Sequence, residues 1–290
     1  MKYIIFALRP KQWIKNLFIF LPLIFGRMLF AFPNNLKTLA AFCLFSLGAS
    51  AAYLLNDIID VKKDRLHPTK RLRPIASGKV SVRDASIAAL VLAALSITLS
   101  FMLDFYFGCI VVIYLIFNII YSKVLKEIVI IDVFCIGAFF LLRIIAGAVV
   151  AGVEISHWIV IMTVLLALFL GFNKRRQELR LLESRAARFR NVLTRYNTYF
   201  IDQMIAVITS SIVVAYMLYT VDARTVAEFD TRGLMFSIPF VYYGIFRYLY
   251  LIHKIRRDGD PTRILLSDRP MQLNIALWIG VCIATIYFGL

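Results

Sequence analysis

The sequence predicts an all-α integral membrane protein. Hydrophobic side chains make up 61% of the 290 residues and charged side chains only 17%, and the mean hydropathy is +0.80. One soluble core of this size cannot bury so much apolar surface. Apolar runs long enough to cross about 30 Å of hydrocarbon recur along the chain. We therefore expect a bundle of nine transmembrane helices, at residues 13–32, 38–58, 81–103, 105–122, 128–152, 156–173, 200–220, 234–253 and 271–289.

Positive charge is distributed unevenly between the predicted connections. The formal net charge is +16, and 27 of the 33 Lys and Arg residues lie before the first span, in the even-numbered connections, or within three residues of these segments. Lys and Arg accumulate on the cytosolic side of membrane proteins. The N-terminus is therefore predicted to be cytosolic, in a multi-pass protein of the cytoplasmic (inner) membrane. The same distribution accounts for the basic composition without a nucleic-acid partner.

The remaining sequence features predict one domain without processing or cross-links. No small-residue cleavage site follows the first apolar run, so we read it as a permanent span. The four cysteines lie in apolar runs at unrelated spacings and the three histidines are scattered. This pattern predicts neither disulfides nor a zinc site. We expect residues 1–290 to form a single transmembrane domain.

The longest predicted cytosolic connection, residues 174–199, is amphipathic. Its apolar residues recur at helical spacings of three and four, and arginines occupy the other faces. The apolar positions are Leu179, Leu182, Ala186, Phe189, Leu193 and Tyr196. The pattern predicts a helix that lies on anionic headgroups.

Four polar residues, Asn56, Asp57, Asp60 and Asp64, stand at the end of the second predicted span, in NDIIDVKKD. At about 100° per residue on one α-helix, all four fall within one narrow face. We expect this helix to continue to His67, because a proline follows and disfavours the α conformation there. Carboxylate and amide oxygens suit Mg²⁺, which also keeps positions for phosphate oxygens.

The alternative for this segment is a solvated helix end, with Asp60 and Asp64 paired to Lys63 or Arg65. The basic segment KRLRPIASG, which follows directly, argues against it. Cations beside a face that carries metal are what a phosphate or diphosphate requires. These cations are Lys70, Arg71 and Arg73.

Other polar residues at the same predicted side of the membrane are expected to contribute. They are Lys15 and Asn16 in RPKQWIKN, Tyr121 and Lys126 in YSKVLK, Arg143 in FLLRIIAG, and Lys174, Arg175 and Glu178 in NKRRQEL. An intramembrane arginine is a functional-site candidate by default. Asp132 lies about three turns from Arg143 on the same predicted helix, which is too far for a direct ion pair.

Together these segments resemble the UbiA superfamily of intramembrane prenyltransferases. The first UbiA signature, NDxxDxxxD between helices 2 and 3 of a nine-helix bundle, matches Asn56, Asp57, Asp60 and Asp64. Most members carry a second aspartate-rich motif between helices 6 and 7, where this chain has NKRRQEL. The longer segments around these motifs are similar to one branch, the decaprenyl-phosphate phosphoribosyltransferases. They are RPKQWIKN, NDIIDVKKDRLHPTKRLRPIASG, YSKVLK, FLLRIIAG and NKRRQEL.

The resemblance implies a UbiA-like bundle with a Mg²⁺-dependent active site at the cytosolic face. The 5-phosphoribosyl group of phosphoribosyl pyrophosphate would pass to a polyprenyl phosphate of the decaprenyl type, and pyrophosphate would leave. The product would serve cell-wall or lipid-linked glycan synthesis, such as arabinan precursors. Membrane lipids are further expected partners, and a homo-oligomer is left open.

The same resemblance implies a role for each candidate residue. The metal set is Asn56, Asp57, Asp60 and Asp64. The catalytic set is Asp57, Asp60, Asp64, Lys174 and Glu178, with Glu178 on ribose hydroxyls or a second metal. The residues expected on the donor phosphates are Lys15, Lys70 and Arg73, and Asn16 is expected to bind substrate. Those expected where the lipid phosphate arrives are Tyr121, Lys126, Arg143, Lys174 and Arg175.

Two other functions remain open from the sequence. One is an ordinary UbiA-type aromatic prenyltransferase that uses a prenyl diphosphate, which a second acid cluster would favour and NKRRQEL does not. The other is a transporter or lipid-binding protein without enzymatic activity. Broken helices at the midplane would favour a transporter, whereas the charges here gather at one predicted face.

Overall fold

The computed structural model describes residues 2–67, 69–182, 195–254 and 261–289, and these residues form helices joined by turns, without a strand. They group into two compact units. The first comprises Met1–Ile155 with Leu182–Tyr196, and the second comprises Ser156–Leu181 with Asn197–Leu290. The all-α prediction is confirmed.

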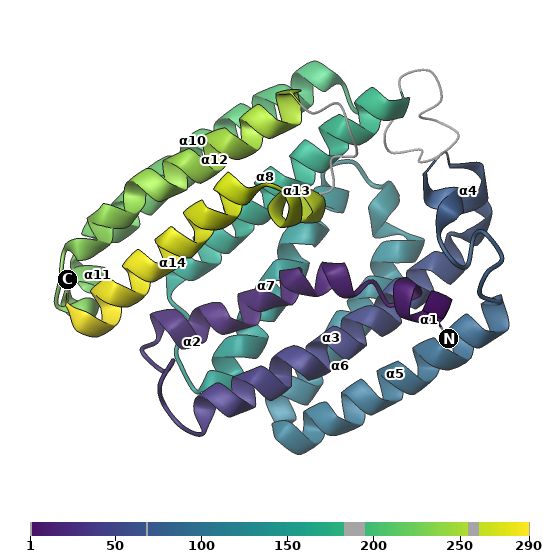
Figure 1. The fold of residues 1–290 in the computed structure, drawn as a ribbon, viewed down its shortest axis with the longest axis horizontal. Helices are drawn as coiled ribbons and strands as arrows, with labels where there is room; N and C mark the ends of the chain where they lie inside the picture. Colours follow the sequence, from purple (N-terminus) through teal and green to yellow (C-terminus); the bar gives the residue numbers. More distant parts are fainter. Residues whose placement is uncertain (1, 68, 183–194, 255–260, 290) are drawn as a thin grey trace. The chain divides into compact units, whose positions relative to one another are not determined.

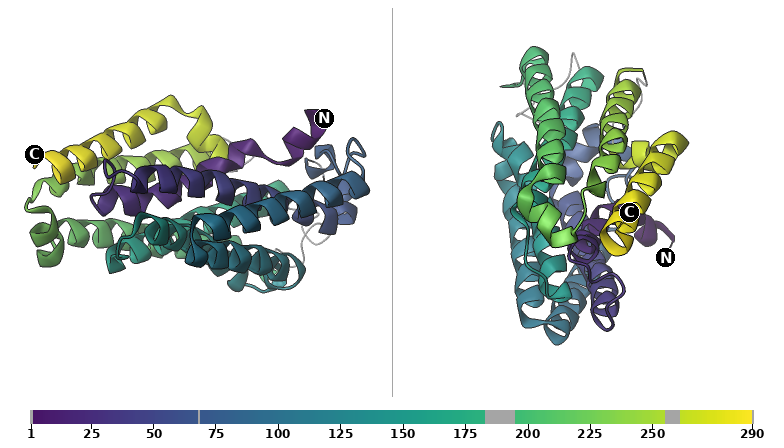
Figure 2. Two further views of the ribbon diagram at one scale, coloured as in Figure 1. Left: turned by 90° about the horizontal axis from the view of Figure 1, so that it is seen from below. Right: turned by 90° about the vertical axis from the view of Figure 1, so that its left-hand side faces the viewer.

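The first unit is built around α3, which packs against α5, α6, α7 and η1. α3, α5 and α6 lie side by side in Figures 1 and 2. The elements of this unit are α1 (Lys2–Ala7), η1 (Pro10–Phe20), α2 (Leu21–Phe25), α3 (Asn34–Ile59), α4 (Val61–Leu66), η2 (Lys70–Leu72), α5 (Val82–Leu103), α6 (Phe105–Lys123), η3 (Leu125–Glu127) and α7 (Ile131–Ala151).

The second unit contains the remaining long helices, among which α12 packs against α10 and α14. Its elements are α8 (His157–Leu182), α10 (Thr198–Val221), α11 (Ala223–Phe229), η5 (Gly233–Ser237), α12 (Ile238–Lys254), α13 (Pro261–Ser267) and α14 (Arg269–Phe288).

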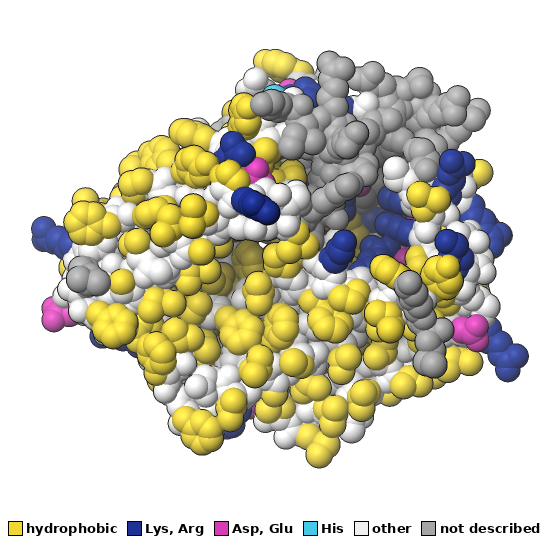
Figure 3. Space-filling view, in the orientation of Figure 1, with side chains coloured by type: hydrophobic (Ala, Val, Ile, Leu, Met, Phe, Trp, Pro, Cys, Tyr) yellow, Lys and Arg dark blue, Asp and Glu magenta, His cyan; other side chains and the backbone are white. Residues whose placement is uncertain are grey.

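Eight helical segments of the described residues are long and apolar enough to cross a membrane. They are Asn34–Ile59, Val82–Leu103, Phe105–Lys123, Ile131–Ala151, His157–Arg180, Thr198–Val221, Gly233–His253 and Arg269–Phe288. Large apolar side chains such as Leu90 and Met102 are 72% and 77% exposed, and hydrophobic side chains cover much of the face in Figure 3. Such a surface suits lipid rather than water. The chain is a multi-pass membrane protein.

The first predicted span, residues 13–32, is not a single α-helix. It is formed by the 3₁₀-helix η1 and the short helix α2, with a proline at the first or second position of each. A 3₁₀-helix rises about 2.0 Å per residue, so η1 and α2 together reach about 30 Å, one hydrocarbon thickness. The count of nine crossings and the orientation stay predictions.

The core of the first unit explains how η1 packs so closely. Ile19 of η1 belongs to a buried cluster with Phe45 and Phe107. A Cβ atom added to Gly147 of α7 would lie 2.0 Å from the Ile19 carbonyl oxygen. Only glycine therefore allows the backbones of η1 and α7 to approach to this distance.

The amphipathic helix expected over residues 174–199 has no separate counterpart in the described residues. Residues 174–182 continue α8, and Thr198 begins α10. Residues 183–194, which hold Ala186, Phe189 and Leu193 of the apolar stripe, lie outside the described residues. Tyr196 is described and is 7% exposed.

Arg247 and Asp268 connect α12 to α14. The Arg247 Nε and Nη2 atoms lie 3.2 and 2.8 Å from the two Asp268 carboxylate oxygens, and Asp268 caps α14 by accepting the Met271 N–H at 2.9 Å. The bonded guanidinium is the main cause that lowers the pKa of Asp268. This stabilisation is therefore present at neutral pH and is lost as the pH falls through the lowered pKa.

We expect Asp268→Ala to lower the unfolding temperature of the detergent-solubilised protein at pH 7. Loss of an N-cap carboxylate costs about 0.5–2 kcal/mol. The difference from wild type should shrink as the pH falls below the ordinary aspartate pKa of about 3.9 and toward the lowered pKa of Asp268. Equal unfolding temperatures at pH 7 would show that the ion pair contributes nothing.

Candidate active site

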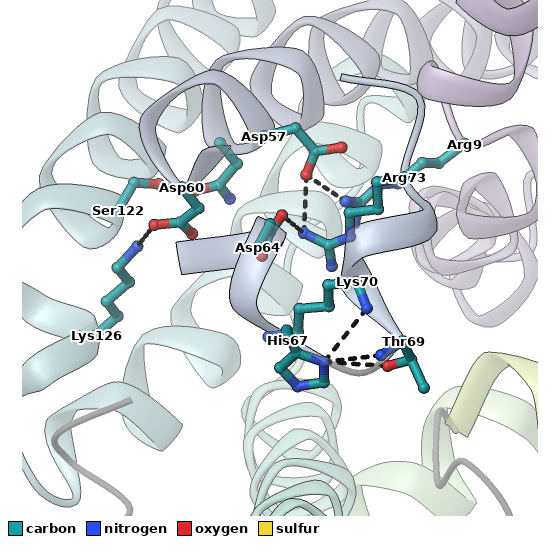
Figure 4. A network of polar contacts seen from close by, with 11 residues as sticks. Arg9, Asp57, Asp60, Asp64, His67, Thr69, Lys70, Arg73, Ser122 and Lys126 are labelled. Carbon is teal, nitrogen blue, oxygen red and sulfur yellow. Dashed lines mark hydrogen bonds and ion pairs between the residues drawn. The ribbon is translucent and has the colours of Figure 1, made fainter. Parts of the chain in front are cut away.

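The aspartate motif forms a network with cations in the first unit (Figure 4). Asp57 at the end of α3 and Asp64 in α4 are 2% and 4% exposed. Arg73, which directly follows η2, lies between them. Its Nη1 atom donates to Asp57 Oδ1 at 2.9 Å and to Asp64 Oδ2 at 2.7 Å. One guanidinium thus holds together two carboxylates that are seven residues apart in the chain.

Arg9 is a second partner of Asp57 and was not among the predicted site residues. Its Nη2 atom donates to Asp57 Oδ1, and its guanidinium lies 5.3 Å from the centre of the Tyr53 ring. The backbone of Arg9 is left-handed, at φ 55° and ψ 58°.

Asp60 points to a different cation, which corrects the predicted single face. α3 ends at Ile59 and α4 begins at Val61, with Asp60 between them at φ −91° and ψ 3°. Its Oδ1 atom accepts from Lys126 Nζ of η3 at 2.6 Å. The helix therefore turns at Asp60, so the angular spacing of one continuous helix does not apply. Its predicted end at His67 is confirmed, where ψ is 136°.

Asn56 is held by a serine that sequence reasoning missed. Ser122 of α6 is 3% exposed, and its hydroxyl is hydrogen bonded to Asn56 Oδ1 and to the Asn118 carbonyl oxygen. Ser122 lies in YSKVLK, between the predicted site residues Tyr121 and Lys126. The neighbourhood was identified, but a serine one position from a predicted residue carries no distinct signal.

One carboxylate oxygen in this network has no hydrogen-bond partner among the described residues. Asp57 Oδ2 is buried and accepts no hydrogen bond, although such an atom is costly to bury. Burial also raises the pKa of Asp64, against the opposing effect of Arg73 and Lys70. The unpartnered Asp57 oxygen marks a position where a further donor or cation can bind.

The donor set is suited to a hard divalent cation. Asn56, Asp57, Asp60 and Asp64 offer only oxygen ligands, and Mg²⁺ typically binds one or two carboxylates together with water and phosphate oxygens. Among the described residues, no three acidic, histidine or cysteine side chains are grouped closely enough to hold a metal by themselves. The unsatisfied Asp57 oxygen fits a metal that brings its remaining ligands from a substrate.

Arg143 and Asn16, both predicted site residues, are buried against each other. Arg143 Nε donates to Asn16 Oδ1 at 2.8 Å, and its Nη atoms donate to the Phe139 carbonyl oxygen and the Tyr114 hydroxyl. Arg143 is 3% exposed, and its guanidinium also lies against the ring of Phe45.

The other predicted residues of the first unit are Lys15, Lys70 and Tyr121, on η1, η2 and α6. Lys15 is half-buried on η1, and Lys70 begins η2, where its N–H donates to His67 Nδ1 at 3.3 Å. The Tyr121 ring meets Phe139 edge-on, with the ring centres 5.6 Å apart. Figure 3 shows Lys and Arg side chains gathered over the region of α4.

Lys174, Arg175 and Glu178 belong to the second unit, on α8. Arg175 Nη1 lies 2.5 Å from Glu178 Oε2, one turn further along the helix, and Arg175 is 1% exposed. The neighbouring Arg176 pairs with Asp202 of α10. A shared site of these residues with the aspartates of the first unit stays a prediction.

The fold and these motifs match known proteins. Residues 19–276 match the UbiA prenyltransferase family. The chain belongs to this family. This UbiA family member is 33% identical to the decaprenyl-phosphate phosphoribosyltransferase of Corynebacterium glutamicum, over 97% of this chain and 86% of that protein. It is also 33% identical to the enzyme of the same name from Mycolicibacterium smegmatis, over 98% and 92% of the two chains.

Solved structures agree on the fold. A UbiA homolog from Archaeoglobus fulgidus, bound to GPP and Mg²⁺, superposes with a TM-score of 0.71 at 20% identity. The match covers 98% of this UbiA chain and 99% of that one. The predicted UbiA-like helical bundle is therefore confirmed.

Proposed function

We propose that this protein transfers a 5-phosphoribosyl group from phosphoribosyl pyrophosphate to a polyprenyl phosphate of the decaprenyl type. The observation that carries the proposal is the 33% identity to decaprenyl-phosphate phosphoribosyltransferases over almost the whole chain. It favours this reaction over transfer of a prenyl group to an aromatic acceptor. The product would enter cell-wall or lipid-linked glycan synthesis.

The reaction requires little proton transfer. A phosphate oxygen of the lipid forms a bond to C1 of the ribose, and the bond between C1 and the diphosphate oxygen breaks. The bonding electrons leave with pyrophosphate. Because the lipid phosphate is already ionised near neutral pH, no strong general base is needed, and catalysis rests on positioning and on charge stabilisation.

The network in the first unit supplies the groups that this reaction needs. Arg9, Lys70 and Arg73 surround Asp57 and Asp64 and are suited to the donor phosphates. Asp57, Asp60 and Asp64, with Asn56 assisting, would hold Mg²⁺. When bound, the ion would neutralise charge on the departing diphosphate. Lys15 completes the proposed donor side.

The acceptor side is proposed around Lys126 and Tyr121 of the first unit. The ion pair with Asp60 places the Lys126 ammonium next to the proposed Mg²⁺ ligands. Asp57 and Asp64, by contrast, pair with cations proposed for the donor phosphates. Lys174 and Arg175 of α8 would add positive charge to the lipid phosphate, and Glu178 would bind ribose hydroxyls or a second metal. Arg143 supports this side from the core, through Asn16 and Tyr114.

A transfer assay tests the function directly. Purified protein in detergent would receive labelled phosphoribosyl pyrophosphate, a polyprenyl phosphate and Mg²⁺, and the label would be followed into the organic phase. We expect lipid-linked label only with metal, and its loss with EDTA. Turnover of a prenyl diphosphate with an aromatic acceptor, and no lipid-linked label, would refute the proposal.

We expect Lys126→Gln to lower transfer by about 10- to 100-fold and to raise KM for the polyprenyl phosphate, because a charged contact to phosphate is lost. Lys63→Gln is the matched control. Lys63 of α4 pairs with Glu127 of η3, and Lys126 of η3 pairs with Asp60, so both ion pairs join the same two segments. The Lys63 side chain is 53% exposed, whereas that of Lys126 is 12% exposed. An exposed pair contributes little. Equal effects of the two substitutions would exclude a specific role for Lys126.

A further inference from the structure

The turn between α6 and α7 carries Lys126 and ends in an unusual backbone conformation. Ile130, the residue before α7, has φ 70° and ψ −48°. A β-branched residue rarely adopts a positive φ, because its Cβ atom crowds the backbone. Such a conformation is strained and persists only where neighbouring groups enforce it.

A buried tyrosine from a distant part of the chain holds this conformation. The Ile130 N–H donates to the Tyr196 hydroxyl oxygen at 2.7 Å. The same hydroxyl donates to Asp132 Oδ1, also at 2.7 Å. Tyr196 is 7% exposed and Asp132 is fully buried. The Tyr196 hydroxyl thus binds the start of α7 by accepting one hydrogen bond, from Ile130, and donating another, to Asp132.

The other end of the same turn is attached to the aspartate motif. Lys126 Nζ lies 2.6 Å from Asp60 Oδ1, and Glu127 Oε1 lies 3.0 Å from Lys63 Nζ. Lys126 and Glu127 both belong to η3, which Ile128 and the next two residues connect to α7. The path of the backbone at Ile130 therefore determines where the Lys126 ammonium can lie.

We propose that Tyr196, through its hydrogen bonds to Ile130 and Asp132, is a positioning residue for Lys126. The proposal rests on the function proposed above, in which Lys126 meets the phosphate of the polyprenyl acceptor. Tyr196 itself touches no substrate. Its hydroxyl keeps Ile130 at positive φ and so keeps η3 in the place where Lys126 faces Asp60.

The test is a double-mutant cycle between Tyr196 and Ile130. Tyr196→Phe removes the hydroxyl only, and we expect kcat/KM for the polyprenyl phosphate to fall about five- to tenfold through KM, with KM for phosphoribosyl pyrophosphate unchanged. Ile130→Gly should restore it in the double variant, because glycine adopts positive φ without the cost. The Ile130 side chain is 39% exposed, so its removal alone costs little packing.

Two controls separate positioning from a general loss of folding. Tyr199→Phe alters an exposed tyrosine three residues away, 72% exposed, and should leave both KM values unchanged. In the Lys126→Gln background, Tyr196→Phe should add no further loss, because its effect passes through Lys126. A fall in kcat alone, no rescue by glycine, or full additivity with Lys126→Gln would overturn the proposal.

A readout without turnover keeps this inference distinct from the proposed function. Hydrogen–deuterium exchange of peptides spanning Ile130 should become faster in Tyr196→Phe, and equilibrium binding of polyprenyl phosphate should weaken by the same five- to tenfold. If wild type transfers no phosphoribosyl group, the proposed function fails, and these two measurements still decide the inference. Unchanged exchange at Ile130 or unchanged lipid binding would overturn it.

Discussion

Asp57→Asn is expected to lower phosphoribosyl transfer by about 10²- to 10³-fold, the loss typical of removing a preorganised electrostatic group. The substitution keeps the shape of the side chain but removes its charge. Arg9 and Arg73 then face each other without the carboxylate they share. The oxygen that has no partner in the protein, Asp57 Oδ2, also disappears as a ligand for Mg²⁺. The assay is initial-rate transfer over a range of Mg²⁺ concentrations.

Asp84→Asn is the matched control for this substitution. Asp84 is an exposed aspartate in the first turn of α5, in the same unit. We expect its activity to stay within about twofold of wild type, since exposed charges contribute little. Equal activity of Asp57→Asn and wild type at every Mg²⁺ concentration would contradict a metal or phosphate role for the motif.

Arg143→Ala is expected to reduce the free energy of unfolding by about 3 kcal/mol or more, through a cavity and lost charged hydrogen bonds. Asn16 Oδ1 and the Tyr114 hydroxyl each lose a buried partner. The aromatic rings around the guanidinium, including Phe45, lose a cation that contributes in a desolvated site. The measurement is denaturant or thermal unfolding of the detergent-solubilised variant, alongside its transfer activity.

Arg232→Ala provides the comparison, because Arg232 is exposed at the N-terminus of η5. Its unfolding should match that of wild type within about 0.5 kcal/mol. If Arg143→Ala unfolds like wild type yet loses transfer, the arginine acts on substrate, and its contacts in the core do not contribute to stability. If both stability and transfer fall together, Arg143 supports the site through the fold.

The arrangement of charges has a further consequence for metal binding. Arg73 holds Asp57 and Asp64 on either side of a single guanidinium nitrogen. A substrate that brings phosphate oxygens offers this arginine a new partner of the same chemistry. The carboxylates can then turn to the cation that accompanies the phosphates. Donor and metal are therefore expected to bind more tightly together than either does alone.

Much of this protein follows from the order of its residues alone. Long apolar runs require helices in a membrane, because backbone polar groups in lipid must be satisfied within the segment. Eight of the nine predicted spans correspond to long apolar helices. The grouping of Asp57, Asp64 and Arg73 was also predictable, because these residues lie within seventeen positions of one another and close to the end of one helix.

Only the tertiary structure decides which cation meets which acid. Arg9 meets Asp57 across 48 positions, and Lys126 meets Asp60 across 66. Arg143 meets Asn16 across 127. These pairs depend on how η1, α3, α6 and α7 pack, and no local pattern encodes that packing. Local sequence determines which charges are present at this face, and long-range packing determines how they are paired.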